Sequence, residues 1–128
     1  MTKPILLLCV LALGGCSAQS KTVFIADFEN VCAYPVSLTV HEYSNAKEPF
    51  VANTQVAQGE VAEVLSYISF NNELEDSFPE SYRLDIAAHG NTHSLDKTHF
   101  LTQLERSAHE RRGNAIYAWK ISDATLCP

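Results

Sequence analysis

Residues 34–43 read Tyr-Pro-Val-Ser-Leu-Thr-Val-His-Glu-Tyr, and this stretch decides the fold class. Three aliphatic side chains in it, Val36, Leu38 and Val40, alternate with polar ones. Successive side chains of a β-strand point to opposite faces of its sheet, so one face of this segment is apolar and the other is polar. The pattern predicts a strand that lies between a hydrophobic core and water.

Three other segments carry a similar pattern of β-branched, aromatic or alternating side chains. They are residues 21–31, residues 82–89, in which Tyr82, Leu84, Ile86 and Ala88 share a face, and residues 114–122, in which Tyr117, Trp119 and Ile121 do. With the hairpin described next, they give roughly seven short strands within residues 21–128, a length that suits one domain. We therefore expect a mainly β fold, an antiparallel β-sandwich of the Ig-like or transthyretin-like class.

A tight hairpin is expected around Gln58-Gly59, because glycine readily adopts the positive φ that such turns require. Its two arms would be residues 50–57 and residues 60–70. Strict alternation along the second arm predicts one shared face for Ala62, Val64, Ser66, Ile68 and Phe70.

One α-helix is expected near the C-terminus, at about residues 97–112. Apolar side chains recur there at helical spacing, at Phe100, Leu101, Leu104 and Ala108. Asp96 can cap the first turn, and Arg111 and Arg112 suit the negative end of the helix dipole. Gly113 is a natural terminator of such a helix.

Residues 71–80 interrupt the strand pattern with four carboxylates and a proline. We expect an exposed acidic loop, which Leu74 and Phe78 could dock to the body of the domain. The candidate partner-binding residues are Glu73, Glu75 and Asp76, because acidic side chains on a loop can complement a basic partner. A charged segment of this kind is also common as a solvated surface.

The first residues have the pattern of a processing segment. Lys3 precedes an apolar run, residues 5–13, that is too short to span a bilayer, for which about 20 residues are needed. The run ends in Leu13-Gly14-Gly15-Cys16, which resembles the lipobox of bacterial lipoproteins at all four positions. A plain secretory signal peptide, with Cys16 as a bystander, is the alternative.

The resemblance implies that residues 1–15 are a lipoprotein signal peptide and that Cys16 becomes the lipidated N-terminus, held in the membrane by acyl chains such as palmitate. Residues 16–20 would then tether a single globular domain, residues 21–128. At about 3.5 Å per residue the tether reaches less than roughly 20 Å, so the domain stays close to the bilayer. Ser17, where an Asp would retain the protein at the inner membrane, implies the outer membrane with the domain in the periplasm.

Two of the four cysteines remain once Cys9 leaves with the signal peptide and Cys16 is lipidated. A pair in an oxidising compartment predicts a disulfide, here between Cys32 and Cys127. It would close nearly the whole domain into one loop, and chain-entropy arguments credit such a loop with roughly 4–5 kcal/mol. Two buried or reactive thiols are the alternative.

The charge balance argues against nucleic acid as a partner. The chain has 9 basic and 15 acidic residues, and loss of Lys3 leaves 8 against 15, a net charge near −7. Such an acidic domain is a poor partner for nucleic acid or for anionic lipid head groups.

Histidines are the strongest candidates for a metal site. His89 and His93 flank Gly90-Asn91, where a turn could bring them face to face, and His99 could join them from the start of the helix. Imidazoles with a carboxylate would suit zinc or copper, although exposed polar positions are the simpler interpretation. The chain has no Gly-x-Ser-x-Gly motif, and its paired carboxylates lie in a loop, so we expect no enzymatic activity and no resident cofactor.

Three functions therefore remain open. The first is a non-enzymatic binding or structural module of the cell envelope, anchored by lipid and facing an envelope protein partner. The second is a periplasmic inhibitor or immunity-type protein that blocks a cationic toxin or a cell-wall hydrolase with its acidic loop. The third is a metal-binding envelope protein.

Overall fold

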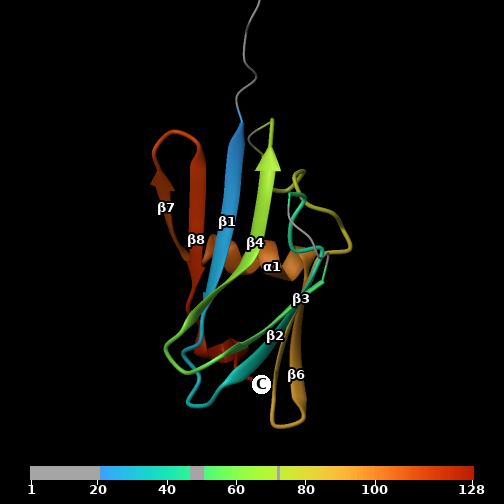
Figure 1. The fold of residues 1–128 in the computed structure, drawn as a ribbon, viewed down its shortest axis with the longest axis vertical. Helices are drawn as coiled ribbons and strands as arrows, with labels where there is room; N and C mark the ends of the chain where they lie inside the picture. Colours follow the sequence, from blue (N-terminus) through green and yellow to red (C-terminus); the bar gives the residue numbers. More distant parts are fainter. Residues whose placement is uncertain (1–20, 47–50, 72) are drawn as a thin grey trace, which may run out of the picture.

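The computed structural model describes residues 21–46, 51–71 and 73–128, which form two four-stranded sheets and one α-helix (Figure 1). The first sheet has the order β4-β1-β8-β7. Its strands are β1 (Thr22–Glu29), β4 (Val61–Ser69), β7 (Ala108–Arg112) and β8 (Ile116–Ile121). Its neighbours are antiparallel except β1 and β8, which run parallel.

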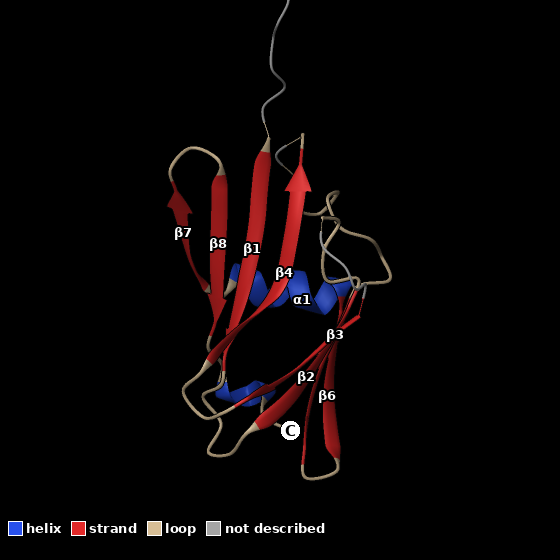
Figure 2. Ribbon diagram, in the orientation of Figure 1, coloured by secondary structure: helices blue, strands red, loops and turns tan. Residues whose placement is uncertain are grey.

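The second sheet has the order β3-β2-β5-β6 and is antiparallel throughout (Figure 2). Its strands are β2 (Val36–His41), β3 (Val51–Val56), β5 (Arg83–Ala88) and β6 (Asn91–Asp96). The expected mainly β sandwich with one helix is confirmed. Its strand order is not that of a constant-type immunoglobulin domain, where the first two strands share a sheet, because here β1 and β2 lie in different sheets.

The core lies between the sheets and under α1 (Lys97–Glu105). Alternation in β2 buries Val36, Leu38 and Val40, as the sequence predicts. An aromatic cluster joins the helix to both sheets: Tyr82 lies 4.6 Å from Phe100 between ring centroids, and its hydroxyl donates a 2.8 Å hydrogen bond to the Val64 carbonyl of β4. Burial of these large rings supplies much of the stabilisation of the domain.

The hairpin expected around Gln58-Gly59 is wrong, although the turn is real. Gly59 has the positive φ (83°), but β3 pairs with β2 and β4 pairs with β1, so the two arms diverge into different sheets. The Asn30 backbone holds this crossing point, since its N–H donates to the Glu60 carbonyl and its carbonyl accepts from the Gly59 N–H.

The single shared face expected for the second arm is also wrong. The pairing of β1 with β4 shifts register between Ala26 and Asp27, so Val64 is an extra residue on its strand. The bulge moves the buried face from even to odd positions, and Leu65 and Tyr67 face the core instead. Phe70 is left exposed.

The helix is shorter than the expected 97–112. Asp96 caps it as predicted, accepting a 2.9 Å hydrogen bond from the His99 N–H, but the helix ends at Glu105. Residues 108–112 form β7, which pairs antiparallel with β8, and Gly113 (φ 64°) turns one strand into the other. Backbone pairing along the open side of β8 outweighs the weak helical preference of this segment.

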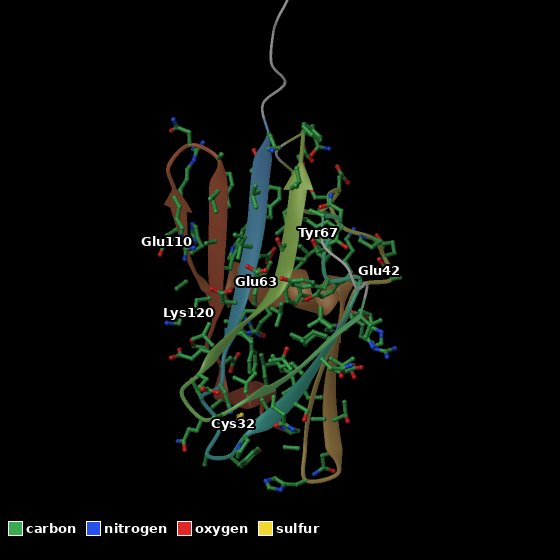
Figure 3. All side chains as sticks on the ribbon, in the orientation of Figure 1. Cys32, Glu42, Glu63, Tyr67, Glu110 and Lys120 are labelled. Carbon is green, nitrogen blue, oxygen red and sulfur yellow. A yellow bond between two sulfur atoms is a disulfide. The ribbon has the colours of Figure 1, made fainter. Side chains whose placement is uncertain are left out.

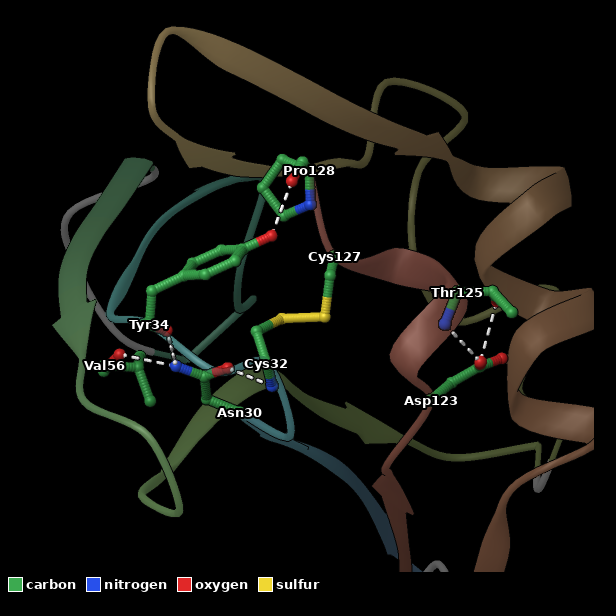
Figure 4. The surroundings of a disulfide bond; sticks show 8 residues. All are labelled: Asn30, Cys32, Tyr34, Val56, Asp123, Thr125, Cys127 and Pro128. Atoms are coloured by element: carbon green, nitrogen blue, oxygen red, sulfur yellow. Dashed lines mark hydrogen bonds between the residues drawn. A yellow bond between two sulfur atoms is a disulfide. The ribbon is translucent and has the colours of Figure 1, made fainter.

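The predicted disulfide is confirmed: Cys32 and Cys127 are bonded, with their Cα atoms 5.7 Å apart (Figure 4). We call this part of the domain, residues 30–34, 57–60 and 123–128, the disulfide end. The opposite part of the first sheet, where β1 begins and β4 ends, is the N-terminal end and comprises Lys21, Phe70, Asn71 and residues 111–115 (Figure 1). In the described part of the chain no helix is long and apolar enough to cross a membrane.

The lipobox-like stretch, Cys16 and the tether lie outside the described residues.

Candidate functional site

The acidic loop between β4 and β5 is the first candidate site. Its three candidate partner-binding residues, Glu73, Glu75 and Asp76, are all exposed. Phe78 docks the loop, because its ring is buried between Tyr82 and Phe100, 5.2 Å and 6.2 Å away between centroids.

Lys97 fixes the far side of the acidic loop to the helix. Its side chain is 8% exposed, and its Nζ donates a 2.7 Å hydrogen bond to the Phe78 carbonyl. The same Nζ lies 3.4 Å from Glu80 and 4.9 Å from the centre of the Phe78 ring. A buried ammonium group is stabilised only when it has polar or aromatic partners of this kind. The contacts of Lys97 therefore fix the backbone next to the exposed carboxylates in one position.

The three histidines proposed as metal ligands are not brought together. His89 occupies the turn itself with a positive φ (54°), and its ring packs 4.5 Å from Tyr34. His93 pairs with Ile86 inside the sheet, and His99 bonds the Asp96 carboxylate at the other end of β6. Among the residues that the structure describes, no group of three His, Cys, Asp or Glu side chains is placed to hold a metal ion.

A second candidate site, on the outer face of the first sheet, was missed by the sequence analysis. Asp27 on β1 lies beside Glu63 of β4 and Lys120 of β8 in the strand register. A hollow of about 300 Å³ opens here over β7, with Asp27, Glu110, Arg112 and Lys120 among its lining residues. Figure 3 shows Glu63, Glu110 and Lys120 projecting from three different strands of this sheet.

Residues 43–45 complete the second site by covering the free edge of β4. The Ser66 N–H donates to the Tyr43 carbonyl at 3.1 Å, and the Asn45 side chain bonds both backbone groups of Ile68. This pairing places the Tyr43 hydroxyl on Glu63, to which it donates a short hydrogen bond. These hydrogen bonds therefore hold the segment next to the Glu63 carboxylate in a fixed position.

The charges at this site are only partly compensated. Partial burial raises the pKa of Asp27 and the neighbouring Glu63 raises it further, while Arg112 and Lys120 act in the opposite direction. Burial and the hydrogen bond to Glu63 raise the pKa of Tyr43, so its phenol keeps its proton and remains a donor. A bound group that is positively charged or donates hydrogen bonds would relieve the repulsion between the carboxylates.

An aspartate on the outer face of the second sheet provides a contrast. Asp85 accepts hydrogen bonds from Ser94 at 2.6 Å and Arg83 at 3.1 Å, and His41 lies 3.3 Å away. Burial alone would raise the pKa of Asp85, but the hydrogen bonds from Ser94 and Arg83 outweigh it and hold the pKa below its usual value. The hydrogen-bonding capacity of the Asp85 carboxylate is therefore already used by side chains of its own sheet, and little of it is left for a ligand.

Comparison of the chain with protein-family models, with curated proteins and with solved structures finds no match.

Proposed function

We propose that the protein is a lipid-anchored lipoprotein of the bacterial cell envelope, a non-enzymatic binding module held at the outer membrane with its domain in the periplasm. The observation that carries the proposal is Leu13-Gly14-Gly15-Cys16, which ends an apolar run and whose cysteine lies only five residues before Lys21, where the described structure begins. Acylation at Cys16 would anchor the domain without a membrane-spanning helix, provided that more than one chain is attached.

The disulfide supports a compartment outside the cytoplasm. Disulfides persist in the periplasm and are rare in the reducing cytosol. The bond between Cys32 and Cys127 joins positions 95 residues apart, so it spans almost all of the described domain.

A second candidate function is inhibition of a cationic toxin or cell-wall hydrolase, and the way the acidic loop is held favours it. Glu73, Glu75 and Asp76 are exposed, while Phe78 and Lys97 fix the loop to the core. A charged loop that is already ordered loses less conformational entropy when it binds, and its charge steers a basic partner toward it.

The anchor is tested by replacing one cysteine at a time. Cys16→Ala should release the protein from the membrane fraction after a carbonate wash. Cys9→Ala is the matched control, because it removes the other thiol of the same segment and should leave the protein in the membrane. Retention of the Cys16→Ala protein in the membrane would overturn the anchoring proposal.

The acidic loop is tested with partner proteins captured by crosslinking in the envelope. Replacing Glu73, Glu75 and Asp76 by Gln, Gln and Asn should slow association with a basic partner and flatten its dependence on salt. The melting temperature should barely change, because exposed substitutions usually alter stability by less than about 0.5 kcal/mol.

A control variant for the loop removes the same charge elsewhere on the domain, with Glu29, Glu42 and Glu60 all changed to Gln. Equal association rates for the two variants at every ionic strength would assign the effect to net charge alone. The loop would then be only a solvated surface.

A further inference from the structure

The N-terminal end of the first sheet carries an exposed aromatic side chain close to the proposed anchor. We propose that this end lies against the surface of an anionic bilayer, with Phe70 inserted among the lipid head groups. The inference rests on the proposed lipid anchor and deepens it, because it states which surface of the domain the membrane contacts.

The strand register places Phe70 beside the start of the chain that the structure describes. β1 and β4 are antiparallel with Thr22 opposite Ser69, so Lys21 and Phe70 follow at the same end of the sheet. The Val23 N–H donates a 2.7 Å hydrogen bond to the Ala115 carbonyl, which brings the β7–β8 turn to this end as well (Figure 1).

Phe70 is unusual among the apolar side chains that the structure describes. It is 57% exposed, and the other large exposed apolar residues in the described ranges are the smaller Val31, Val51 and Val61. A phenylalanine ring that is exposed to water does not gain the favourable free energy of burial. An aromatic ring at the head-group level of a bilayer is stabilised there.

The length of chain before Lys21 determines which end of the domain the membrane can contact. Five residue steps separate Cys16 from Lys21, so the anchored cysteine lies within less than roughly 20 Å of β1. Val61 begins β4 and Phe70 follows its end, which separates them by roughly 30 Å along the strand. The tether is therefore shorter than the sheet, and the N-terminal end is the part held at the membrane.

Charge at the N-terminal end fits an anionic lipid surface, although the domain as a whole is acidic. Lys21, Arg111 and Arg112 are exposed there. Arg111 donates to the Asn114 carbonyl at 3.3 Å and Arg112 pairs with Glu110 at 3.2 Å, while Asp76 lines a shallow hollow with Phe70. Basic side chains close to a membrane are attracted to anionic head groups over about a Debye length. Glu110 offsets the charge of Arg112, so Lys21 and Arg111 are the cations that favour this orientation.

The test uses the full lipidated protein, reconstituted into vesicles of phosphatidylglycerol and phosphatidylethanolamine with brominated acyl chains. Two variants place a tryptophan at opposite ends of β4, Phe70→Trp and Val61→Trp. The parent protein, which contains only Trp119, gives the background for both. Bromine quenches tryptophan at short range, so the loss of fluorescence relative to unbrominated vesicles reports insertion.

We expect Phe70→Trp to lose roughly half of its added fluorescence, since an interfacial side chain sits about 5–10 Å into the head-group and acyl boundary. Val61→Trp should lose almost none. Flotation of each protein with the vesicles is measured first. If none floats, the lipid anchor itself is wrong; if all float and Phe70→Trp is quenched no more than Val61→Trp, the anchor stands and the proposed orientation is overturned.

A second outcome concerns what covers position 70. Emission from Phe70→Trp that is already blue-shifted in detergent, and insensitive to bromine in vesicles, would show that a second copy of the chain or another protein buries this residue. That result would also contradict the inference.

Discussion

The two ends of the sandwich are built in opposite ways. At the disulfide end the chain is closed by a covalent bond, and the Tyr34 hydroxyl donates a 2.6 Å hydrogen bond to the Pro128 carbonyl (Figure 4). At the N-terminal end Phe70 and Lys21 are exposed, and the arginine side chains make only surface contacts. The disulfide end therefore stabilises the fold, whereas the N-terminal end leaves apolar and basic side chains exposed.

Asn30 shows how completely the disulfide end is satisfied. Its side chain is fully buried, donates to the carbonyls of Tyr34 and Val56, and accepts from the Cys32 N–H at 2.8 Å. A buried polar group is tolerated only when it is hydrogen-bonded, so this residue fixes three backbone groups from two segments, residues 32–34 and the end of β3. The covalent closure and the proposed membrane contact therefore belong to opposite ends of one small domain, and five variants test that division.

Loss of the disulfide should have the largest effect. Replacing Cys32 and Cys127 together by Ala frees a loop of 95 residues, which should lower the free energy of unfolding by roughly 4–5 kcal/mol. Urea denaturation of the variant and of the parent with and without reductant measures this. A variant that matches the oxidised parent would show that the bond does not hold this end.

Asn30→Ala should have the second largest effect. It leaves two carbonyls and one N–H at the disulfide end without their partner, at about 1–3 kcal/mol for an unsatisfied buried group. Asn53→Ala, at an exposed position on β3, is the control and should change the free energy of unfolding in urea by less than about 0.5 kcal/mol. Equal effects of the two changes would contradict the importance of the buried network.

Asp27→Asn and Asp85→Asn should have smaller effects of opposite sign. The raised pKa of Asp27 means that its ionised form destabilises the folded state above that pKa, and the penalty disappears as the pH falls through it. The lowered pKa of Asp85 means that its ionised form stabilises the fold above the ordinary carboxyl pKa, and this is lost as the pH falls through the lower folded value. Solvent screening keeps each effect below about 1 kcal/mol at pH 7.

Thermal unfolding between pH 3 and pH 7 checks the pair of aspartates. Asp27→Asn should raise the melting temperature at pH 7 and lose that advantage in acid, whereas Asp85→Asn should lower it at pH 7. Changes of the same sign in both variants would contradict the contrast between the two sheets.

Phe70→Ser should have the smallest effect on stability. The side chain is mostly exposed, so we expect a change in unfolding free energy within about 0.5 kcal/mol. A loss above about 2 kcal/mol in urea denaturation would mean that Phe70 belongs to the core and not to a contact surface.

Sequence patterns predicted the individual strands of this molecule better than they predicted which strands pair. Alternation identified β2 and the buried face of β5, and the compartment argument identified the partner of Cys32. Alternation does not say which strands are neighbours, so it missed both the parallel pairing of β1 with β8 and the divergence of the arms after Gly59.

The second site escaped prediction for the same reason. Asp27, Glu63 and Tyr43 come from three segments that meet only after the sheet has formed, and a bulge at Val64 sets which side chains of β4 face outward. The acidic loop was predicted because its residues are contiguous, whereas the Lys97 contact that holds it crosses 19 positions in the chain.

The proposed lipid anchor at Cys16 is tested most directly by the mass of the N-terminal peptide of the mature protein, isolated from the cell envelope. Trypsin should cut after Lys21 and release residues 16–21. We predict that this peptide begins at Cys16 and carries acyl chains on its thiol. A mature protein that begins at any other residue, or an unmodified Cys16 peptide, would contradict the claim that the N-terminal end is held at the membrane.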